Sequence, residues 1–332
     1  MIVTSPGRVN IIGDHTDYVG GLAMPCAIDL AVTASFEPAS DIDLTSDATA
    51  EHAAFSLPLP DDAGATTWTR LVHAVASRVP DVRGAQGRLT TTLPIGAGLS
   101  SSAACTIALA LTLGFDGDRR ALVLLAQAAE QAATGVPCGV LDQLAIVYGE
   151  AGHACVVDAA AVTASPISFP EDARLLVVPS GHHRTLSDTP YAQRRTEAER
   201  AMAEVGGLEQ ATVADALSVA DPVLRRRARH VVTENARVTA CAEAFAAGDL
   251  RRAGALMLES HTSLNKDAEV STKDLNQLVD ALSTRKGVFG ARLTGAGFGG
   301  SVIALVEPGA GVALAATFGG RLVTPSNGAR LV

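Results

Sequence analysis

The chain has 332 residues, a formal net charge of −9 and 48% hydrophobic residues, enough apolar material for one large or two medium cores. This composition excludes global disorder, and the acidic balance argues against a nucleic-acid partner because a phosphate backbone repels negative charge. The longest apolar run, Ala103–Leu113, is too short for a membrane-spanning helix, and the five scattered cysteines indicate thiols of a reducing compartment. We therefore expect a soluble, cytoplasmic protein that makes no membrane contact.

The first half of the chain mixes short strands with helices. Alternating apolar residues predict a strand over Ala27–Phe36, followed by edge strands and loops in residues 37–66. Helices are predicted over Trp68–Arg78, Arg119–Ala133 and Gly139–Tyr148, and a further helix runs from the loop at Pro94–Ala104 to about Leu113. Strands are predicted over Arg88–Leu93 and Ala154–Asp158.

The second half is more helical. It contains predicted helices over Pro190–Val205, Val223–Ala246, Leu250–Glu259, Thr272–Ser283 and Ala310–Phe318, and predicted strands over Leu175–Pro179, Val288–Thr294 and Ser301–Glu307. Because strands and helices do not alternate as regular βαβ units, the pattern favours an α+β fold over a doubly wound sheet. A change of composition near residues 165–170 predicts an N-terminal domain of residues 1–166 and a C-terminal domain of residues 167–332.

Charged residues are concentrated in the segment PGRVNIIGDHTDYVGG, residues 6–21. The group consists of Arg8, Asp14, His15 and Asp17, and it lies among apolar residues. Such density predicts a polar site built on a strand edge. A solvated loop with surface ion pairs is the alternative.

Two glycine-rich segments are candidates for ligand contact. Pro94–Ala104 (PIGAGLSSSAA) precedes an apolar helix, where glycines let the backbone approach a ligand and free N–H groups attract anions. With its three serines it suits a polyphosphate, although it is not a Walker loop and a simple helix cap is the alternative. Gly295–Ser301 (GAGFGGS) lies between two strands, where a bulged hairpin without chemistry is the alternative.

Two carboxylates, Glu130 and Asp142, lie on separate elements because Gly135 and Pro137 break the helix between them. Near a triphosphate, a carboxylate would either bind Mg²⁺ or orient a nucleophilic hydroxyl. A helix-capping or surface acid is the alternative for each of them.

The motifs PGRVNIIGDHTDY, LPIGAGLSSSAA, CGVLDQ and LTGAGFGGS occur in an order that resembles the GHMP small-molecule kinases, and among them most closely the galactokinases. The segments YAQRR, HVVTENAR and LMLESHTSL extend the resemblance over nearly the whole chain. It implies a two-domain α+β GHMP kinase fold, with an N-terminal domain like ribosomal protein S5 domain 2, a GHMP C-terminal domain and the active site in the cleft between them.

The resemblance also implies roles for individual residues. Asp142 would face the attacking sugar hydroxyl, as a base or only as an orienting group, and Arg8 would lie near the transferring phosphoryl group. The other implied contacts are to the sugar at Asp14, His15, Asp17, Gly139 and Tyr191, to the ATP phosphates at Gly96, Gly98, Leu99, Ser100, Ser101, Ser102 and Gly297, and to Mg²⁺ at Ser102 and Glu130. Trp68 is either near the adenine or a core residue.

Two features depart from the galactokinase pattern. Asp14 stands where galactokinases have glutamate, and the missing methylene draws the carboxylate back by ~1.5 Å. Residues 180–184 (SGHHR) form either a solvent-facing loop or a pocket for a phosphate already present on the substrate.

Three activities follow from these observations. The first is an ATP-dependent galactokinase, and the second is a kinase for a related sugar or cyclitol, phosphorylated beforehand or not. The third is a non-catalytic sugar sensor, which the intact phosphate loop and Asp142 disfavour. The expected partners are ATP, Mg²⁺ and a small-molecule substrate, for a monomer or small homo-oligomer.

Overall fold

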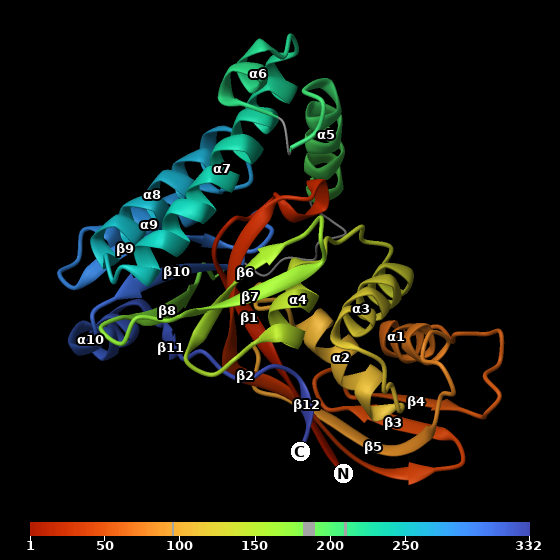
Figure 1. The fold of residues 1–332 in the computed structure, drawn as a ribbon. Helices are drawn as coiled ribbons and strands as arrows, with labels where there is room; N and C mark the ends of the chain where they lie inside the picture. Colours follow the sequence, from red (N-terminus) through yellow and green to blue (C-terminus); the bar gives the residue numbers. More distant parts are fainter. Residues whose placement is uncertain (95, 182–189, 209–210) are drawn as a thin grey trace.

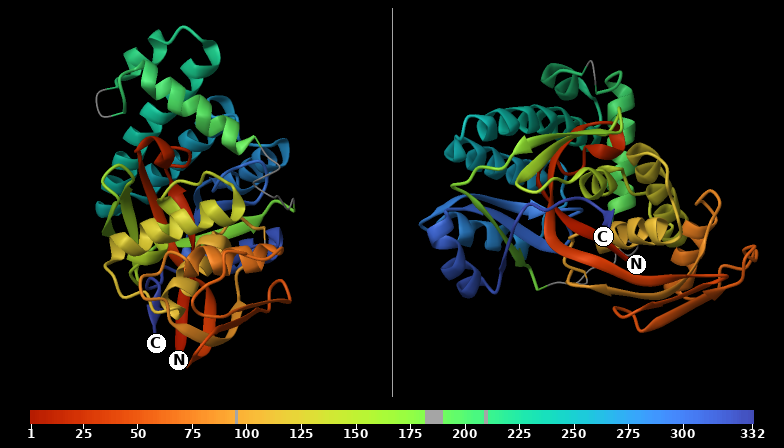
Figure 2. Two further views of the ribbon diagram at one scale, coloured as in Figure 1. Left: turned by 90° about the vertical axis from the view of Figure 1, so that its right-hand side faces the viewer. Right: turned by 60° about the horizontal axis from the view of Figure 1, so that its bottom comes forward.

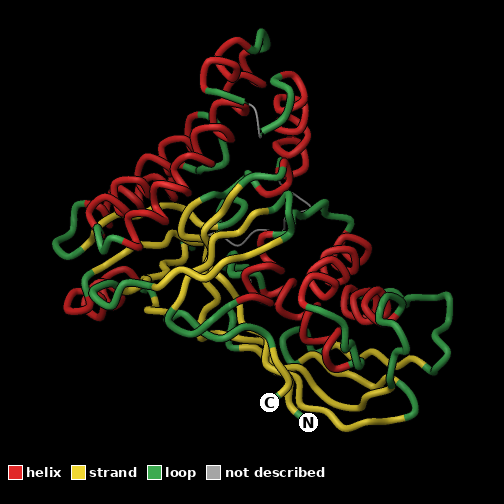
Figure 3. Tube along the Cα trace, in the orientation of Figure 1, coloured by secondary structure: helices red, strands yellow, loops and turns green. Residues whose placement is uncertain are grey.

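The computed structural model describes residues 1–94, 96–181, 190–208 and 211–332, which form two β-sheets with helices packed against them (Figure 1). Most strands gather in the middle and lower part of the view, and helices lie around them (Figure 3). The α+β fold class predicted from the sequence is confirmed. No helix within these described ranges is long and apolar enough to cross a bilayer.

The first sheet contains the N-terminal strands and also the last strand of the chain. Its order is β12-β1-β2-β5-β3-β4, with β6 paired to β2 and β7 paired to β6; only β3 and β5 pair in parallel. Because β12 pairs with β1, the two ends of the chain lie side by side (Figure 2). The strands are β1 (Ile2–Ile12), β2 (Leu22–Ala39), β3 (Ile42–Ser46), β4 (Glu51–Phe55), β5 (Gly84–Thr91), β6 (His153–Asp158), β7 (Thr163–Ser168) and β12 (Arg330–Leu331).

Helices α1 (Thr67–Ala76), α2 (Ser101–Thr112), α3 (Arg119–Thr134) and α4 (Leu141–Tyr148) pack on this part of the molecule. The side chain of Asp118 caps the start of α3, and the helix ends at Gly135, whose φ of 71° suits glycine. Both α2 and α4 contact β1 and β2. The first turns of these two helices are therefore held close to β1.

The second sheet is antiparallel and has the order β11-β8-β10-β9. Its strands are β8 (Arg174–Pro179), β9 (Val288–Thr294), β10 (Ser301–Val306) and β11 (Arg321–Val323). The helices of this half are α5 (Tyr191–Glu204), α6 (Val213–Ser218), α7 (Pro222–Ala246), α8 (Leu250–Lys266), α9 (Lys273–Ser283) and α10 (Pro308–Phe318). Among these, α8 and α9 pack on β9, and α7 packs along α8 (Figure 1).

A single large hydrophobic cluster joins the two halves. It includes Ile11 and Ile12 of β1 together with Leu256 and Met257 of α8. The backbone N–H of Asn10 also donates to the hydroxyl of Thr294, over 2.9 Å, which ties β1 to β9. The site described below lies where these parts meet.

Several elements differ from the sequence-based prediction. The strand expected over Ala27–Phe36 is the middle of the longer β2, and β1 spans Ile2–Ile12, where the sequence predicted only a strand edge without bounds. The reason is that β1 is buried on both faces and its pairing shifts register twice, which removes the alternating pattern. Helix α6 and strand β7 were also missed, and the division between residues 166 and 167 stays a prediction.

Candidate active site

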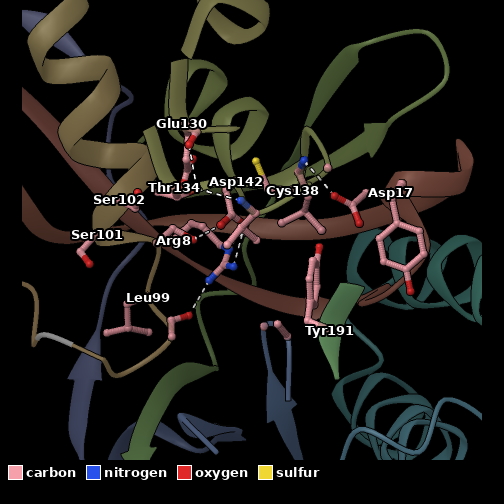
Figure 4. Close-up of a pocket in the computed structure, with 18 of the residues that line it drawn as sticks. Arg8, Asp17, Leu99, Ser101, Ser102, Glu130, Thr134, Cys138, Asp142 and Tyr191 are labelled. Carbon is pink, nitrogen blue, oxygen red and sulfur yellow. Dashed lines mark hydrogen bonds and ion pairs between the residues drawn. The ribbon is translucent and has the colours of Figure 1, made fainter. Parts of the chain in front are cut away.

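A cavity of about 500 Å³ opens between the first turns of α2 and α4, the loop after β1 and the start of α5 (Figure 4). Nearly all of the residues proposed from the sequence line it: Arg8, Asp14, His15, Asp17, Gly96, Gly98, Leu99, Ser100, Ser101, Ser102, Glu130, Gly139, Asp142 and Tyr191. Gly297 is not in the lining; it packs against Val270, while Gly295 and Ala296 of the same loop form the wall. The phosphate contact of Gly297 stays a prediction.

Arg8 and Asp142 form an ion pair at the centre of the cavity (Figure 4). Arg8 is on β1, and its Nε and Nη2 lie 2.7 and 2.6 Å from Oδ1 of Asp142 in the first turn of α4. The hydroxyl of Ser100 donates to the other oxygen, Oδ2, over 2.5 Å. The arginine therefore holds one carboxylate oxygen with two N–H groups and leaves Oδ2 as the oxygen able to receive a further donor.

The loop before α2 is shaped for a close approach of backbone to a ligand. Gly96 and Gly98 have φ values of 73° and 76°. The loop is held from two sides, because Arg8 donates from Nη1 to the Gly98 carbonyl over 2.7 Å and Ser301 donates to the Ala97 carbonyl over 2.7 Å. Ser101 and Ser102 begin α2 and face the cavity, where the backbone N–H groups of the first helical turn can bind an anion.

A second polar group lies at the other end of the cavity. Asp17 Oδ2 accepts from the backbone N–H of Leu141 over 3.4 Å. The rings of His15, Tyr18 and Tyr191 pack edge to face or tilted, with centroids 5.7 to 6.2 Å apart. His15 also contacts the Ala296 carbonyl through Nε2 and the Tyr18 hydroxyl through Nδ1, so its ring orientation is fixed by both halves of the molecule.

Asp14 is held differently from the neighbouring acids. Its Oδ2 accepts from Nη2 of Arg292 over 2.6 Å, and its Oδ1 accepts from the backbone N–H of Gly295 over 3.1 Å. Burial raises the pKa of Asp14, and the charge of Arg292 opposes that rise. The shorter side chain noted in the sequence therefore lies against the second half of the molecule.

The partners of Asp14 were not among the residues proposed from the sequence. Arg292 on β9 has a fully buried side chain, and Glu234 on α7 is buried beside it, 3.9 Å from Nη2. Glu234 accepts from the backbone N–H of Gly13 and from Ser260, and His230 Nε2 contacts the Asp14 carbonyl. These residues lie within or next to the segments HVVTENAR, LMLESHTSL and LTGAGFGGS, which carry part of the family resemblance. That resemblance was the signal that could have identified them. Helical patterning could not, because it places charged residues on solvated faces.

Besides Asp14, two further acids of the cavity have raised pKa values. Burial and then the charge of Asp142 raise the pKa of Asp17 to about 6. Burial raises the pKa of Glu130 to about 7, and Asp142 adds to the rise, while hydrogen bonds from Ser102 and Gln143 oppose it. Glu130 and Asp142 therefore do converge on one cavity, although their elements are separate in the sequence.

Two other sequence features are not part of the described cavity. Trp68 is 4% exposed and its indole N–H donates to the Leu44 carbonyl over 3.0 Å, so it is a core residue. Of residues 180–184, Ser180 donates its backbone N–H to the Gly300 carbonyl over 2.8 Å. His182, His183 and Arg184 lie outside the described residues, so a phosphate pocket there stays a prediction.

Replacing Gly139 by alanine is expected to weaken binding of a sugar, the ligand that the resemblance implies for this position, at least tenfold. A Cβ at this position would lie 1.7 Å from Asp17 Oδ2, so the carboxylate would have to move. Isothermal titration with sugar measures the effect. Gly309→Ala is the matched control, because nothing lies within 4 Å of a Cβ there. Equal sugar affinity in the Gly139→Ala protein would show that Asp17 does not contact the ligand.

The raised pKa of Glu130 predicts a pH-dependent stability. Its pKa is higher in the folded protein, about 7, than its ordinary value of 4.5, so the folded state holds the proton more tightly. The free energy of unfolding should therefore fall as pH rises from 4.5 to about 7, and Glu130→Gln should remove about 1–3 kcal/mol of that fall. Urea unfolding across this range tests it, with exposed Glu37→Gln as control. Parallel curves for wild type and Glu130→Gln would contradict the assignment.

Comparison with known proteins defines the class first. The GHMP kinases N terminal domain matches residues 67–150 and the GHMP kinases C terminal domain matches residues 241–319. A mevalonate kinase from Methanococcus jannaschii, 20% identical, has the same fold with a TM-score of 0.69 over 98% of each chain. The two-domain fold with its helix-opening glycine and serine loop is thus that of the GHMP kinases.

More specific similarities follow. The galactokinase galactose-binding signature matches residues 1–38. The galactokinase of Thermococcus kodakarensis is 39% identical over 95% of this chain and 91% of its own, and that of Homo sapiens is 35% identical over 93% and 84%. The structure of the Lactococcus lactis galactokinase complexed with galactose, 28% identical, has a TM-score of 0.92 and covers 100% of this chain and 95% of that one. The chain belongs to the galactokinase family.

Proposed function

We propose that the chain is a galactokinase, which transfers the γ-phosphoryl group of ATP to the anomeric hydroxyl of galactose and releases ADP. The observation that carries this proposal is the continuity of one cavity: the start of α2, the Arg8–Asp142 pair and the Asp17–Tyr191 end all line it. A phosphoryl donor at α2 and a polyol at Asp17 would meet at Asp142. Membership of the galactokinase family supports the choice of galactose.

Positioning and charge neutralisation supply most of the rate in phosphoryl transfer. Oδ2 of Asp142 would accept a hydrogen bond from the attacking hydroxyl and receive its proton as the new O–P bond forms and the bond to ADP breaks. Two N–H groups of Arg8 already occupy Oδ1 of this carboxylate, so we assign it mainly to orientation, with proton transfer late. The guanidinium of Arg8 would also face the charge that develops on the phosphoryl group.

The residues fit a magnesium ion carried with the nucleotide. Burial raises the pKa of Glu130 and the charge of Asp142 adds to the rise, so a cation beside the two carboxylates would stabilise their ionised forms. Ser102 and Glu130 would hold the ion together with the bound nucleotide, since Mg²⁺ prefers oxygen ligands. When bound, Mg²⁺ neutralises phosphate charge.

The cavity is also lined by residues of α1, of the end of α3 and of the loop that follows α3: Thr67, Arg70, Ala133, Thr134 and Val136. We assign these residues to the nucleoside, because α1 and α3 pack against α2, whose first turn we assign to the phosphates. The buried Trp68 would then support the wall from behind without contacting the base.

A coupled ADP-release assay over hexoses, hexose phosphates and cyclitols tests the proposal. We expect the highest kcat/KM with galactose, at least tenfold above the other acceptors. A higher value for another sugar or a cyclitol would reassign the substrate. This outcome is worth testing because Asp14, which replaces the glutamate of galactokinases, has its carboxylate bonded to Arg292. Binding of ATP and galactose without turnover would favour a sugar sensor. Reactions lacking acceptor correct for ATP hydrolysis.

A further inference from the structure

Ser100 makes a contact that its position does not predict. It is the N-cap residue of α2, where a serine side chain commonly accepts a bond from the helix backbone. Here no such cap bond forms, and the hydroxyl donates instead to Oδ2 of Asp142 over 2.5 Å. The side chain of the phosphate loop thus reaches the residue assigned to the sugar hydroxyl.

The backbone at Ser100 is in the left-handed region, with φ 59° and ψ 42°. This conformation costs a non-glycine residue roughly 1 kcal/mol, and glycine would adopt it freely. Gly96 and Gly98 of the same loop have positive φ as well. The left-handed conformation at Ser100 therefore directs toward Asp142 a hydroxyl group that glycine would lack.

A serine hydroxyl has only one proton to donate. Ser100 lies between the bound-phosphate position expected at the start of α2 and Asp142, and all three border the same cavity. Its proton can point to a phosphate oxygen or to Oδ2, but not to both. When it points to a phosphate, Asp142 keeps only the bonds from Arg8 on Oδ1, and Oδ2 becomes a stronger acceptor for a sugar hydroxyl.

We propose that Ser100 is a positioning residue that couples nucleotide binding to sugar binding. Bound ATP would draw the Ser100 proton away from Asp142 and so tighten the hold of Asp142 on the sugar hydroxyl. By linkage, the sugar tightens nucleotide binding by the same factor. This inference rests on the proposed galactokinase function. We expect a coupling factor of about 5–20, at the lower end of the usual range, because a single hydrogen bond is redirected and not lost.

Calorimetric binding of galactose with and without a non-hydrolysable ATP analogue and Mg²⁺ tests the coupling. In the wild type, the analogue should lower the Kd for galactose by about 5–20-fold. In Ser100→Gly, which removes the hydroxyl and relieves the positive φ, the ratio of the two Kd values should fall to about 1. A merely structural role would change each Kd but leave their ratio unaltered.

Two further variants separate the causes. Ser100→Ala lacks the hydroxyl but keeps the backbone strain, so it should give the same ratio as Ser100→Gly. Ser101→Ala, at the first residue of α2, should weaken binding of the analogue while keeping the wild-type ratio of the two Kd values. These two variants also serve if Ser100→Gly fails to fold.

The outcomes distinguish the two proposals. A wild type that binds neither galactose nor the analogue overturns the proposed function and with it the coupling. A wild type that binds both with a ratio of 1, or a wild-type ratio preserved in both Ser100 variants, overturns the coupling alone.

Discussion

Replacement of Asp142 by asparagine is expected to lower kcat by about 10²–10⁴-fold while the Kd for the ATP analogue stays within about threefold of wild type. Asparagine has the same shape, and its oxygen can keep the contacts with Arg8 that span 2.6–2.7 Å. It loses the charge that would orient the sugar hydroxyl and receive its proton. Steady-state kinetics with galactose and calorimetry with the analogue measure the two quantities.

Asp172→Asn is the control for this experiment, because Asp172 is an exposed carboxylate outside the cavity lining. It should have wild-type kcat. An Asp142→Asn enzyme that retains more than a third of the wild-type kcat would show that neither proton transfer nor orientation depends on this carboxylate. A lost affinity for the analogue would instead indicate a role in holding the phosphate loop, through Ser100.

Replacement of Arg292 by methionine is expected to reduce the free energy of unfolding by about 3–5 kcal/mol, because removing one partner strands a buried charge. The buried guanidinium lies 2.6 Å from Asp14 and 3.9 Å from Glu234. Without it two buried carboxylates face each other across an apolar side chain. Urea unfolding at pH 7 measures the loss, and the KM for galactose should rise because Asp14 lines the cavity in which we propose that the sugar binds.

The sign of the pH dependence separates this mechanism from simple loss of packing. Burial already raises the pKa of Asp14, and removing Arg292 takes away the main opposing charge, so the pKa rises further. The folded variant then binds a proton more tightly than the unfolded chain, and its stability deficit should shrink as pH falls from 7 to 5.

Two further variants check the origin of the deficit. Arg292→Met/Asp14→Asn should recover part of the lost stability, because one stranded charge is gone. Arg251→Met, an exposed arginine on α8, should change stability by no more than about 0.5 kcal/mol. A deficit below 1 kcal/mol in Arg292→Met, or one independent of pH, would contradict the ion-pair account.

Local patterning predicted much of the fold. The helix stop at Gly135 was correct because a positive φ and a missing side chain end a helix regardless of tertiary context. β1 was not predicted over its full length because both of its faces are buried, and its polar residues, proline and glycine give neither a period-2 alternation nor an apolar run. Helix α8 extends past the predicted end at Glu259 to Lys266, where packing on β9 stabilises polar residues that look like a surface loop.

The sequence alone determined which residue types form the site. Contiguous motifs identified the phosphate loop, the charged segment in residues 6–21 and the segment CGVLDQ that contains Asp142. Each of them could be recognised because neighbouring residues determine its local backbone. Nearly every residue proposed from them lines the cavity. The motif order also predicted the family, which the comparisons confirm.

Only the tertiary structure decided which partner each functional side chain has. Arg8 and Asp142 are 134 positions apart, and Asp14 and Arg292 are 278 apart, so no periodicity links them. The pairing of these side chains depends on which buried charges lie close together in the packed core, because an unpaired buried charge destabilises the folded state. The bond from Ser100 to Asp142 arises in the same way, from the left-handed turn that sets α2 beside α4.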